Sequence, residues 1–87
     1  MFYVYILQSK KDDNLYVGYT NDFKKRFIKH NSGKVYSTKL RRPFTWIYLE
    51  ICHNKEDATQ REKYLKSGRG KRFIKQRLSN YFQGHIN

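Results

Sequence analysis

The sequence predicts an α+β domain, with a small antiparallel three-stranded sheet flanked by helices in the order β-β-α-β-α-α. Three observations support this fold class. Two β-prone segments near the N-terminus lie on either side of a short polar turn. One amphipathic helix separates them from a third, longer β-prone segment. Two further helical segments follow. Because 87 residues is the size of one small domain, we expect residues 1–87 to form a single domain.

The first two segments, FYVYILQ (residues 2–8) and LYVGYT (residues 15–20), flank the polar cluster SKKDDN. Their composition and spacing are typical of a β-hairpin. Because strand side chains alternate between faces, one face of the first strand carries Tyr3, Tyr5 and Leu7. In the second strand Tyr16 and Gly18 share a face, and the side chains on the opposite face are those of Leu15, Val17 and Tyr19.

A helix is expected over residues 22–31, with Asp22 or Asn21 as its N-cap and Asn31-Ser32-Gly33 at its end. Residues 34–43 resemble an exposed basic loop. The segment FTWIYLEIC (residues 44–52) is strongly β-prone and predicts the third strand, in which we expect Trp46 to be part of the core.

A second helix begins at Asn54, a good N-cap residue, and Asp57 in its first turn complements the helix dipole. The segment SGRG (residues 67–70) is expected to interrupt it. Residues 71–82 then predict a third, basic helix. Its inward-facing residues would be Phe73, Ile74, Leu78 and Phe82.

Charge is the strongest compositional signal. Nineteen Lys and Arg against seven Asp and Glu give a net charge of +12, which favours a polyanionic partner, most often nucleic acid. Alternatively, the charge serves only to keep the protein soluble. An anionic membrane surface is a less favoured partner, because no basic amphipathic segment with a distinct apolar face is present.

A single cysteine, Cys52, excludes an internal disulfide, and the histidines lack zinc-ligand spacing. No leader or membrane-spanning segment is apparent, so a cytoplasmic protein is expected.

Two helices place charged residues among apolar ones. Arg26 and His30 share a face with Phe23 and Phe27 in the first helix, and Glu62 follows the apolar stripe of the second. A buried, uncompensated carboxylate costs several kcal/mol, so Glu62 needs a partner or a wet cleft. Three arrangements satisfy this pattern: a Glu62–Arg26 salt bridge, side chains that extend to water at the sheet edge, or one cleft lined by all three residues.

The cleft arrangement has a definite chemistry. Glu62 would bind a hard divalent cation such as Mg²⁺, which prefers oxygen ligands and keeps most of its water. Arg26 would contact a phosphate oxygen and stabilise charge at phosphorus. A tyrosine hydroxyl from the hairpin would take a proton from water. These residue types suit phosphodiester hydrolysis.

Together these residues resemble the GIY-YIG nuclease family. Its two naming triplets are similar to Tyr3-Val4-Tyr5 and Tyr16-Val17-Gly18, followed by Arg26 and His30 in RFIKHNSG and by Glu62 in EDATQREKYLK. The resemblance covers most of residues 2–75 and is strongest to small stand-alone bacterial members, close to the nuclease subunit of junction endonucleases. Thr38-Lys39 and the segment PFTW (residues 43–46) agree with it.

The resemblance implies a catalytic role for each matched residue. Tyr16 would act as general base or orient the attacking water, and Tyr5 would position that water or a phosphate oxygen. Arg26 would stabilise the transition state. His30 would assist proton transfer or orient Tyr16. Glu62 would be the sole protein ligand of one Mg²⁺ or Mn²⁺, and the product would be a nick with a 5′-phosphate and a 3′-hydroxyl.

The sequence departs from the family pattern at three matched positions. Tyr3 stands where the first triplet has glycine, Val17 replaces isoleucine, and Tyr19 stands where DNA-repair members often carry lysine. No convincing match exists for the asparagine that some members place after the glutamate helix.

We therefore expect a metal-dependent endonuclease acting on DNA, on branched or damaged structures in repair or recombination. The alternative is a non-catalytic nucleic-acid-binding module that retains the nuclease fold. RNA as substrate, a partner protein for substrate choice and the oligomeric state remain open. The cations expected to contact the nucleic-acid backbone are Lys25, Lys39, Arg41, Arg42, Arg69, Lys71 and Arg72.

Overall fold

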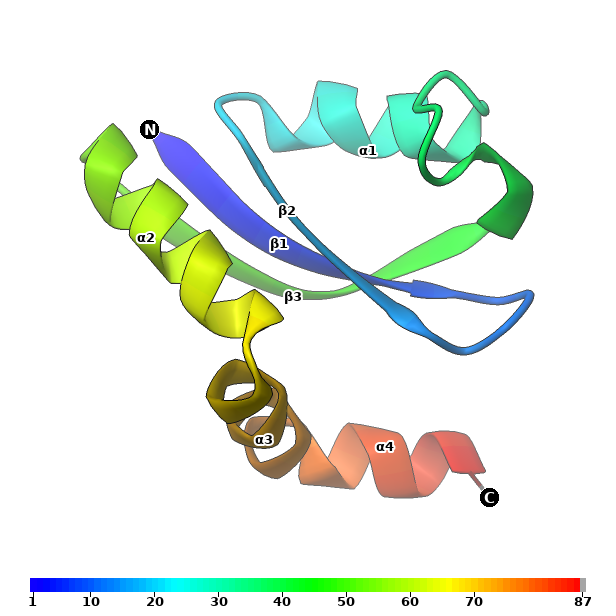
Figure 1. Cartoon of the computed structure of the whole chain (residues 1–87). Coiled ribbons are helices and arrows are strands. Elements are labelled where there is room, and N and C mark those ends of the chain that lie inside the picture. Colours follow the sequence, from blue (N-terminus) through cyan, green and yellow to red (C-terminus); the bar gives the residue numbers. More distant parts are fainter. Residues whose placement is uncertain (87) are drawn as a thin grey trace.

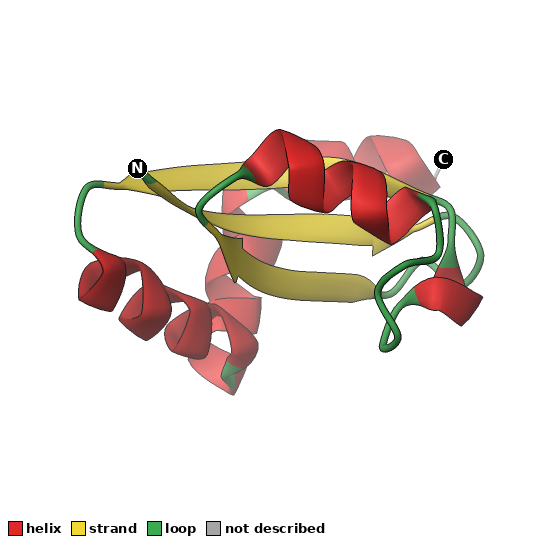
Figure 2. Ribbon diagram, turned by 90° about the horizontal axis from the view of Figure 1, so that it is seen from above, coloured by secondary structure: helices red, strands yellow, loops and turns green. Residues whose placement is uncertain are grey.

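The computed structural model describes residues 1–86 and contains a three-stranded antiparallel sheet with helices on both faces (Figures 1 and 2). The strands are β1 (Phe2–Ser9), β2 (Leu15–Thr20) and β3 (Phe44–Cys52), and their order in the sheet is β2-β1-β3. The central strand is therefore β1, and β2 lies at an open edge. This confirms the predicted α+β class and the predicted hairpin.

Helix α1 (Phe23–Asn31) covers one face of the sheet, whereas α2 (Lys55–Lys66), α3 (Gly68–Arg77) and α4 (Ser79–Ile86) lie on the other side (Figure 1). A short 3₁₀ helix, Lys39–Arg41, interrupts the connection from α1 to β3. No helix within residues 1–86 is long and apolar enough to cross a membrane.

The alternation of side chains along the hairpin agrees with the sequence prediction. Val4 and Ile6 point toward α2 and α3, where they form a core with Ala58, Leu65 and Ile74. The side chains on the α1 face are those of Tyr5, Leu7 and Phe44, with Tyr16, Phe23, Phe27 and Leu49 packed against them. The α1 face is thus mostly aromatic, and it contains the first predicted site tyrosine.

Both predicted N-caps are confirmed. The Asp22 side chain accepts a hydrogen bond from the backbone N–H of Lys25, and the Asn54 side chain accepts from those of Glu56 and Asp57. Each cap satisfies N–H groups that have no partner within their own helix. These caps fix where α1 and α2 begin, and hence which of their residues face the sheet.

The C-terminal helical region differs from the prediction of one helix over residues 71–82. Ser67 ends α2 and also caps α3, its side chain accepting from the Gly70 N–H at 3.2 Å, so α3 begins at Gly68 without a loop. A Cβ at Gly70 would lie 2.0 Å from the Tyr64 carbonyl oxygen, so only glycine permits this close turn between helices. Helix α3 ends at Arg77, and α4 is a separate element.

Two expectations about burial are corrected. Trp46 is 52% exposed, although we expected it in the core. Trp46 lies on the edge strand β3, where its ring forms T-shaped contacts with the rings of Phe23 and Phe27 but half of the side chain is left to solvent. The basic loop of residues 34–43 is mostly exposed, as predicted, but two of its own residues, Val35 and Thr38, are buried.

Helix α2 is anchored to β3 by a bidentate ion pair. Both Glu50 carboxylate oxygens accept from the Arg61 guanidinium at 2.9 Å, and the Tyr48 hydroxyl donates to the same carboxylate. The guanidinium also lies over the rings of Tyr64 and Phe73. Paired geometry of this kind restricts the rotation of α2, and it therefore orients the neighbouring Glu62.

Asn31 links the end of α1 to the start of β3. Its side-chain oxygen accepts from the Phe44 N–H at 2.7 Å, and its amide donates to the Phe44 carbonyl at 3.2 Å. Because Phe44 is buried, Asn31→Ala leaves backbone groups without these partners. We expect a loss of about 1–3 kcal/mol in the free energy of unfolding, measured by urea denaturation.

The control for this prediction is Asn80→Ala, which removes the same side chain at an exposed position. We expect it to change the free energy of unfolding by less than about 0.5 kcal/mol. Equal effects of the two substitutions would contradict a structural role for the Asn31 bridge.

Candidate active site

Arg26 and His30 lie one turn apart on the face of α1 that packs on the sheet. They share that face with Phe23 and Phe27, whose rings stack with centroids 5.8 Å apart. Arg26 is partly exposed, whereas His30 is fully buried. The predicted mixed face of this helix is therefore real, and its two polar residues need partners on the sheet or in the loop.

Tyr5 is the partner from the central strand. It is paired with Gly18 across the hairpin, and its side chain crosses β2 directly over that glycine. A Cβ at Gly18 would lie 2.4 Å from both the Tyr5 hydroxyl oxygen and the ring carbon that bears it. The absence of a side chain at Gly18 thus leaves the space through which the phenol reaches α1.

The Tyr5 hydroxyl starts a buried hydrogen-bonded chain. Its oxygen lies 2.9 Å from His30 Nε2, and His30 Nδ1 lies 2.8 Å from the Thr38 hydroxyl oxygen. The Thr38 hydroxyl in turn lies 3.5 Å from the Val35 carbonyl, to which it donates. Both ring nitrogens of His30 are therefore satisfied inside the protein, one from β1 and one from the loop after α1.

The Thr38–Val35 hydrogen bond determines which group donates in each of the other hydrogen bonds of this chain. Since the Thr38 hydroxyl proton points to a carbonyl, its oxygen accepts from His30 Nδ1–H, and Nε2 is left to accept from the Tyr5 hydroxyl. The Tyr5 oxygen then has lone pairs available. The Arg26 guanidinium, which can only donate, interacts with that oxygen. The chain thus connects a buried threonine to the charged group of Arg26.

The electrostatics agree with a neutral imidazole. Burial, together with the nearby Arg26 charge, lowers the pKa of His30 from 6.5 to about 4. Burial also raises the pKa of Tyr5. The contact with Tyr5 raises the pKa of Arg26. At neutral pH the cluster therefore holds one positive charge, on Arg26, with His30 and Tyr5 uncharged.

Tyr16 lies beside this chain on the edge strand. Its ring meets the His30 ring edge-on, with centroids 5.0 Å apart, and lies 6.4 Å from the Tyr5 ring. Unlike Tyr5, which is 1% exposed, Tyr16 is only partly buried. The Arg26 guanidinium also interacts with the Tyr16 hydroxyl. Tyr16 is thus the tyrosine of this cluster that can meet a ligand from solvent.

Glu62 belongs to α2, on the other side of the sheet from α1, and its carboxylate makes a minor contribution to the raised pKa of Tyr5. Its ion pair is with Lys66 one turn later, at 3.1 Å, and not with Arg26 as one of the sequence alternatives required. The Glu62 side chain is 23% exposed, so the carboxylate remains accessible to water and to a ligand.

The donor set determines which metal chemistry the site can offer. Within residues 1–86 no group of three or more His, Cys, Asp or Glu side chains is placed to hold a metal ion. A single partly exposed carboxylate suits a hard cation that keeps most of its water, such as Mg²⁺. The residues therefore fit the expected arrangement in which Glu62 is the one protein ligand.

The comparison with known families now decides the identity of the domain. The family model described as the GIY-YIG catalytic domain matches residues 1–73. The chain belongs to the GIY-YIG family. The match includes β1 to β3, α1, α2 and the first part of α3, and therefore every residue of the candidate site.

Bacterial relatives support this assignment. A UPF0213 protein of Staphylococcus saprophyticus is 44% identical over 75% of this chain and 79% of its own length. A UPF0213 protein of Clostridium perfringens is 45% identical over 76% of this chain and 71% of its own length. The solution NMR structure of the UPF0213 protein BH0048 from Bacillus halodurans is 40% identical, with a TM-score of 0.53, and the match covers 85% of this chain and 82% of that one.

Four of the predicted site residues lie together on the α1 face, namely Tyr5, Tyr16, Arg26 and His30. The predicted nucleic-acid contacts are spread over several elements. Lys25 is exposed on α1, and Lys39 and Arg42 are exposed in the loop before β3. Arg41 is engaged within the protein, in an ion pair with Asp12 at 3.1 Å. The remaining predicted contacts are exposed on α3: Arg69, Lys71 and Arg72.

Sequence reasoning missed the function of Thr38. The Thr38-Lys39 pair was part of the family resemblance, but no periodicity indicates that a loop threonine is fully buried against His30. The one available signal was chemical: a buried histidine needs partners for both ring nitrogens, and a hydroxyl residue eight positions later can supply one.

The lowered pKa of His30 predicts how stability depends on pH. Between pH 6.5 and about 4 the unfolded chain binds a proton at this histidine and the folded chain does not. Stability is therefore greatest above pH 6.5 and falls as the pH is lowered toward 4, by roughly 3 kcal/mol from this group. We expect urea denaturation at several pH values to show this loss.

The matched variant is His30→Gln, which does not titrate in this range and should lack this part of the pH dependence. Because other groups titrate alike in both proteins, the difference between the two curves isolates His30. Parallel curves for wild type and variant would show that His30 is protonated as easily in the folded protein as in the unfolded chain.

Proposed function

We propose that this protein is a metal-dependent endonuclease that hydrolyses phosphodiester bonds in DNA, at branched or damaged structures in repair or recombination. One observation carries the proposal. Tyr16 and Arg26 lie at the partly exposed edge of the site, and the buried chain of Tyr5, His30 and Thr38 lies behind them. A surface carboxylate, guanidinium and phenol together suit hydrolysis at phosphorus.

Tyr16 is the proposed general base. It is the partly exposed tyrosine of the cluster, and the Arg26 guanidinium lies near its hydroxyl. The edge of the neutral His30 ring fixes one side of the phenol. In this role Tyr16 orients a water molecule and takes its proton as the oxygen attacks phosphorus.

Arg26 stabilises the negative charge that develops on the phosphate oxygens. Its guanidinium lies near the Tyr5 hydroxyl, which is itself held by His30, and His30 by Thr38. Preorganised charge of this kind needs no rearrangement during the reaction. Tyr5 and His30 are nearly or fully buried, so we assign them as positioning residues that act through Arg26 and Tyr16.

Glu62 would hold the divalent cation, Mg²⁺ or Mn²⁺. When bound, such an ion polarises the phosphate and stabilises charge on the departing oxygen. Lys66, paired with Glu62 in this structure, is 55% exposed and can turn to a phosphate instead. The net charge of +12 supports DNA as the polyanionic substrate.

Three substitutions test the proposal, with nicking of supercoiled plasmid and of labelled branched DNA measured in Mg²⁺ or Mn²⁺. Tyr16→Phe removes the proton acceptor and should lower the rate by about 10²–10⁴-fold. Arg26→Ala removes transition-state charge stabilisation and should cost about 10²–10³-fold. Glu62→Gln should remove most metal-dependent cleavage at low metal concentration.

Lys63→Gln is the control, because Lys63 is an exposed cation on α2 that is not among the proposed site residues. It should cut at a rate within a few-fold of wild type. If the folded wild type binds DNA but cuts no substrate with either metal, and Glu62→Gln binds equally well, the chain is a binding module with a nuclease fold and the proposal is wrong.

A further inference from the structure

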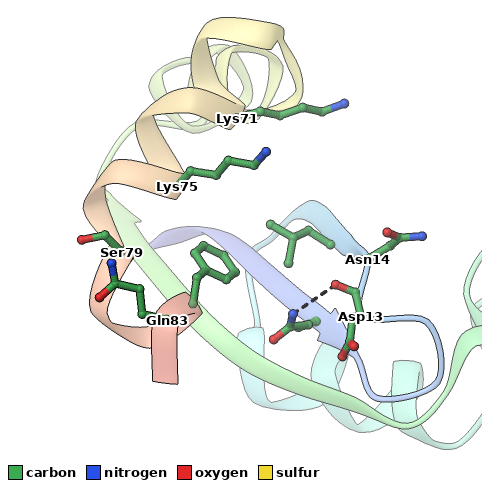
Figure 3. Close-up of a pocket in the computed structure, with 9 residues that line it drawn as sticks. Asp13, Asn14, Lys71, Lys75, Ser79 and Gln83 are labelled. Atoms are coloured by element: carbon green, nitrogen blue, oxygen red, sulfur yellow. Dashed lines mark hydrogen bonds between the residues drawn. The ribbon is translucent and has the colours of Figure 1, made fainter. Parts of the chain in front are cut away.

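A cavity lies away from the candidate catalytic cluster, between the hairpin turn and the C-terminal helices. Its volume is about 700 Å³, within the range of small-ligand pockets. Figure 3 shows Lys71 and Lys75 extending from α3 on one side, with Asp13 and Asn14 of the hairpin facing them. Ser79 and Gln83 of α4 close a third side.

A second, smaller cavity of about 240 Å³ lies beside this pocket. It is lined by Tyr16 and Val17 of β2 and by Lys66 at the end of α2. Leu15 and Lys71 line both cavities. Because β2 is an edge strand and the two cavities share these two residues, the cavities lie next to each other along that edge, and the proposed base Tyr16 lines the smaller one.

The charges along the two cavities suit a phosphate backbone. Lys66, Lys71 and Lys75 line their helical side, and the last two are one turn apart on α3. All three are exposed. Lys71 and Lys75 can bind phosphate oxygens directly, whereas Lys66 would first leave its ion pair with Glu62. Asp13 is the one acidic residue among those that line the two cavities. A strand held at Tyr16 would therefore be attracted along the edge toward the pocket.

The interior of the pocket suits a nucleobase better than a phosphate. Leu15 and the ring of Phe82 are apolar surfaces against which a base can stack. Gln8 is fixed by the Tyr81 hydroxyl at 2.5 Å and by the Asp13 carbonyl at 3.0 Å. The amides of Asn14 and Gln83 supply donors and acceptors for a base edge.

The pocket is also an addition to the family domain. The family match ends at residue 73, whereas Lys75, Ser79, Phe82 and Gln83 all follow it. Helix α4 therefore builds one wall of the pocket outside the matched catalytic domain. A feature of this kind, next to a shared site, is suited to substrate choice rather than to chemistry.

We propose that this pocket binds an unpaired nucleotide of the strand being cut, next to the scissile phosphate. A base within a duplex is stacked and cannot enter such a pocket, whereas a base in a single-stranded tail or at a branch can. The inference rests on the proposed function and gives it a substrate class: DNA with an unpaired nucleotide beside the cleavage point.

The test uses a duplex with a single-stranded tail containing 2-aminopurine, a fluorescent base whose emission falls on stacking, and a fully paired duplex of equal total charge. Binding is measured by anisotropy without metal, so that no DNA is cut. Wild type should bind the tailed DNA more tightly and quench the probe. Phe82→Leu keeps an apolar side chain but removes the ring, and should lower the preference for the tail about tenfold.

Lys75→Gln should weaken binding of the tailed DNA more than that of the duplex, and the equal-charge control Lys63→Gln should affect both alike. Circular dichroism confirms that each variant is folded. Unchanged probe fluorescence, or an unchanged preference in folded Phe82→Leu, would overturn the inference. Cleavage by wild type without any preference for unpaired DNA would overturn it while leaving the proposed endonuclease intact. A preference for the tailed DNA without any cleavage would support the nucleotide pocket and contradict the proposed endonuclease activity.

Discussion

The hydrogen bond between the Tyr5 hydroxyl and His30 Nε2 is the contact on which the rest of the site depends. It joins the central strand to the helix that covers it, and it crosses the edge strand at the one position without a side chain, Gly18. A neutral histidine can accept that bond only if its other nitrogen donates elsewhere, which Thr38 permits. Gly18, the glycine of the second family triplet, is therefore required because a side chain there would block the Tyr5 hydroxyl from reaching His30.

This constraint explains why an arginine occupies an aromatic helix face. Arg26 is one turn before His30, so the same phenol that bonds the histidine also meets the guanidinium. Burying a charge without partners costs several kcal/mol, but here the tyrosine oxygens supply partners and the partly exposed position leaves the remaining donors available. The protein thus stabilises a cation at the sheet edge, where a phosphate can reach it.

Much of the fold could be predicted from local signals. Alternation placed Tyr5 and Tyr16 on the correct face, and the Asp22 cap fixed which side of α1 meets the sheet. The predictions that failed concern contacts between distant elements. Trp46 has core-like chemistry, yet too little structure covers it. The split of the last helix depends on how closely Gly70 approaches α2, which no local pattern encodes.

The most direct test of this account is the titration of His30, followed by NMR of its ring nitrogens in wild type and in Tyr5→Phe. The buried chain predicts one fixed neutral tautomer in the wild type, protonated on Nδ1, that persists until the pH approaches about 4. Tyr5→Phe should free Nε2 and disturb both the tautomer and the titration. An imidazole that exchanges between tautomers and titrates near its ordinary pKa of 6.5 in the folded wild type would contradict the account.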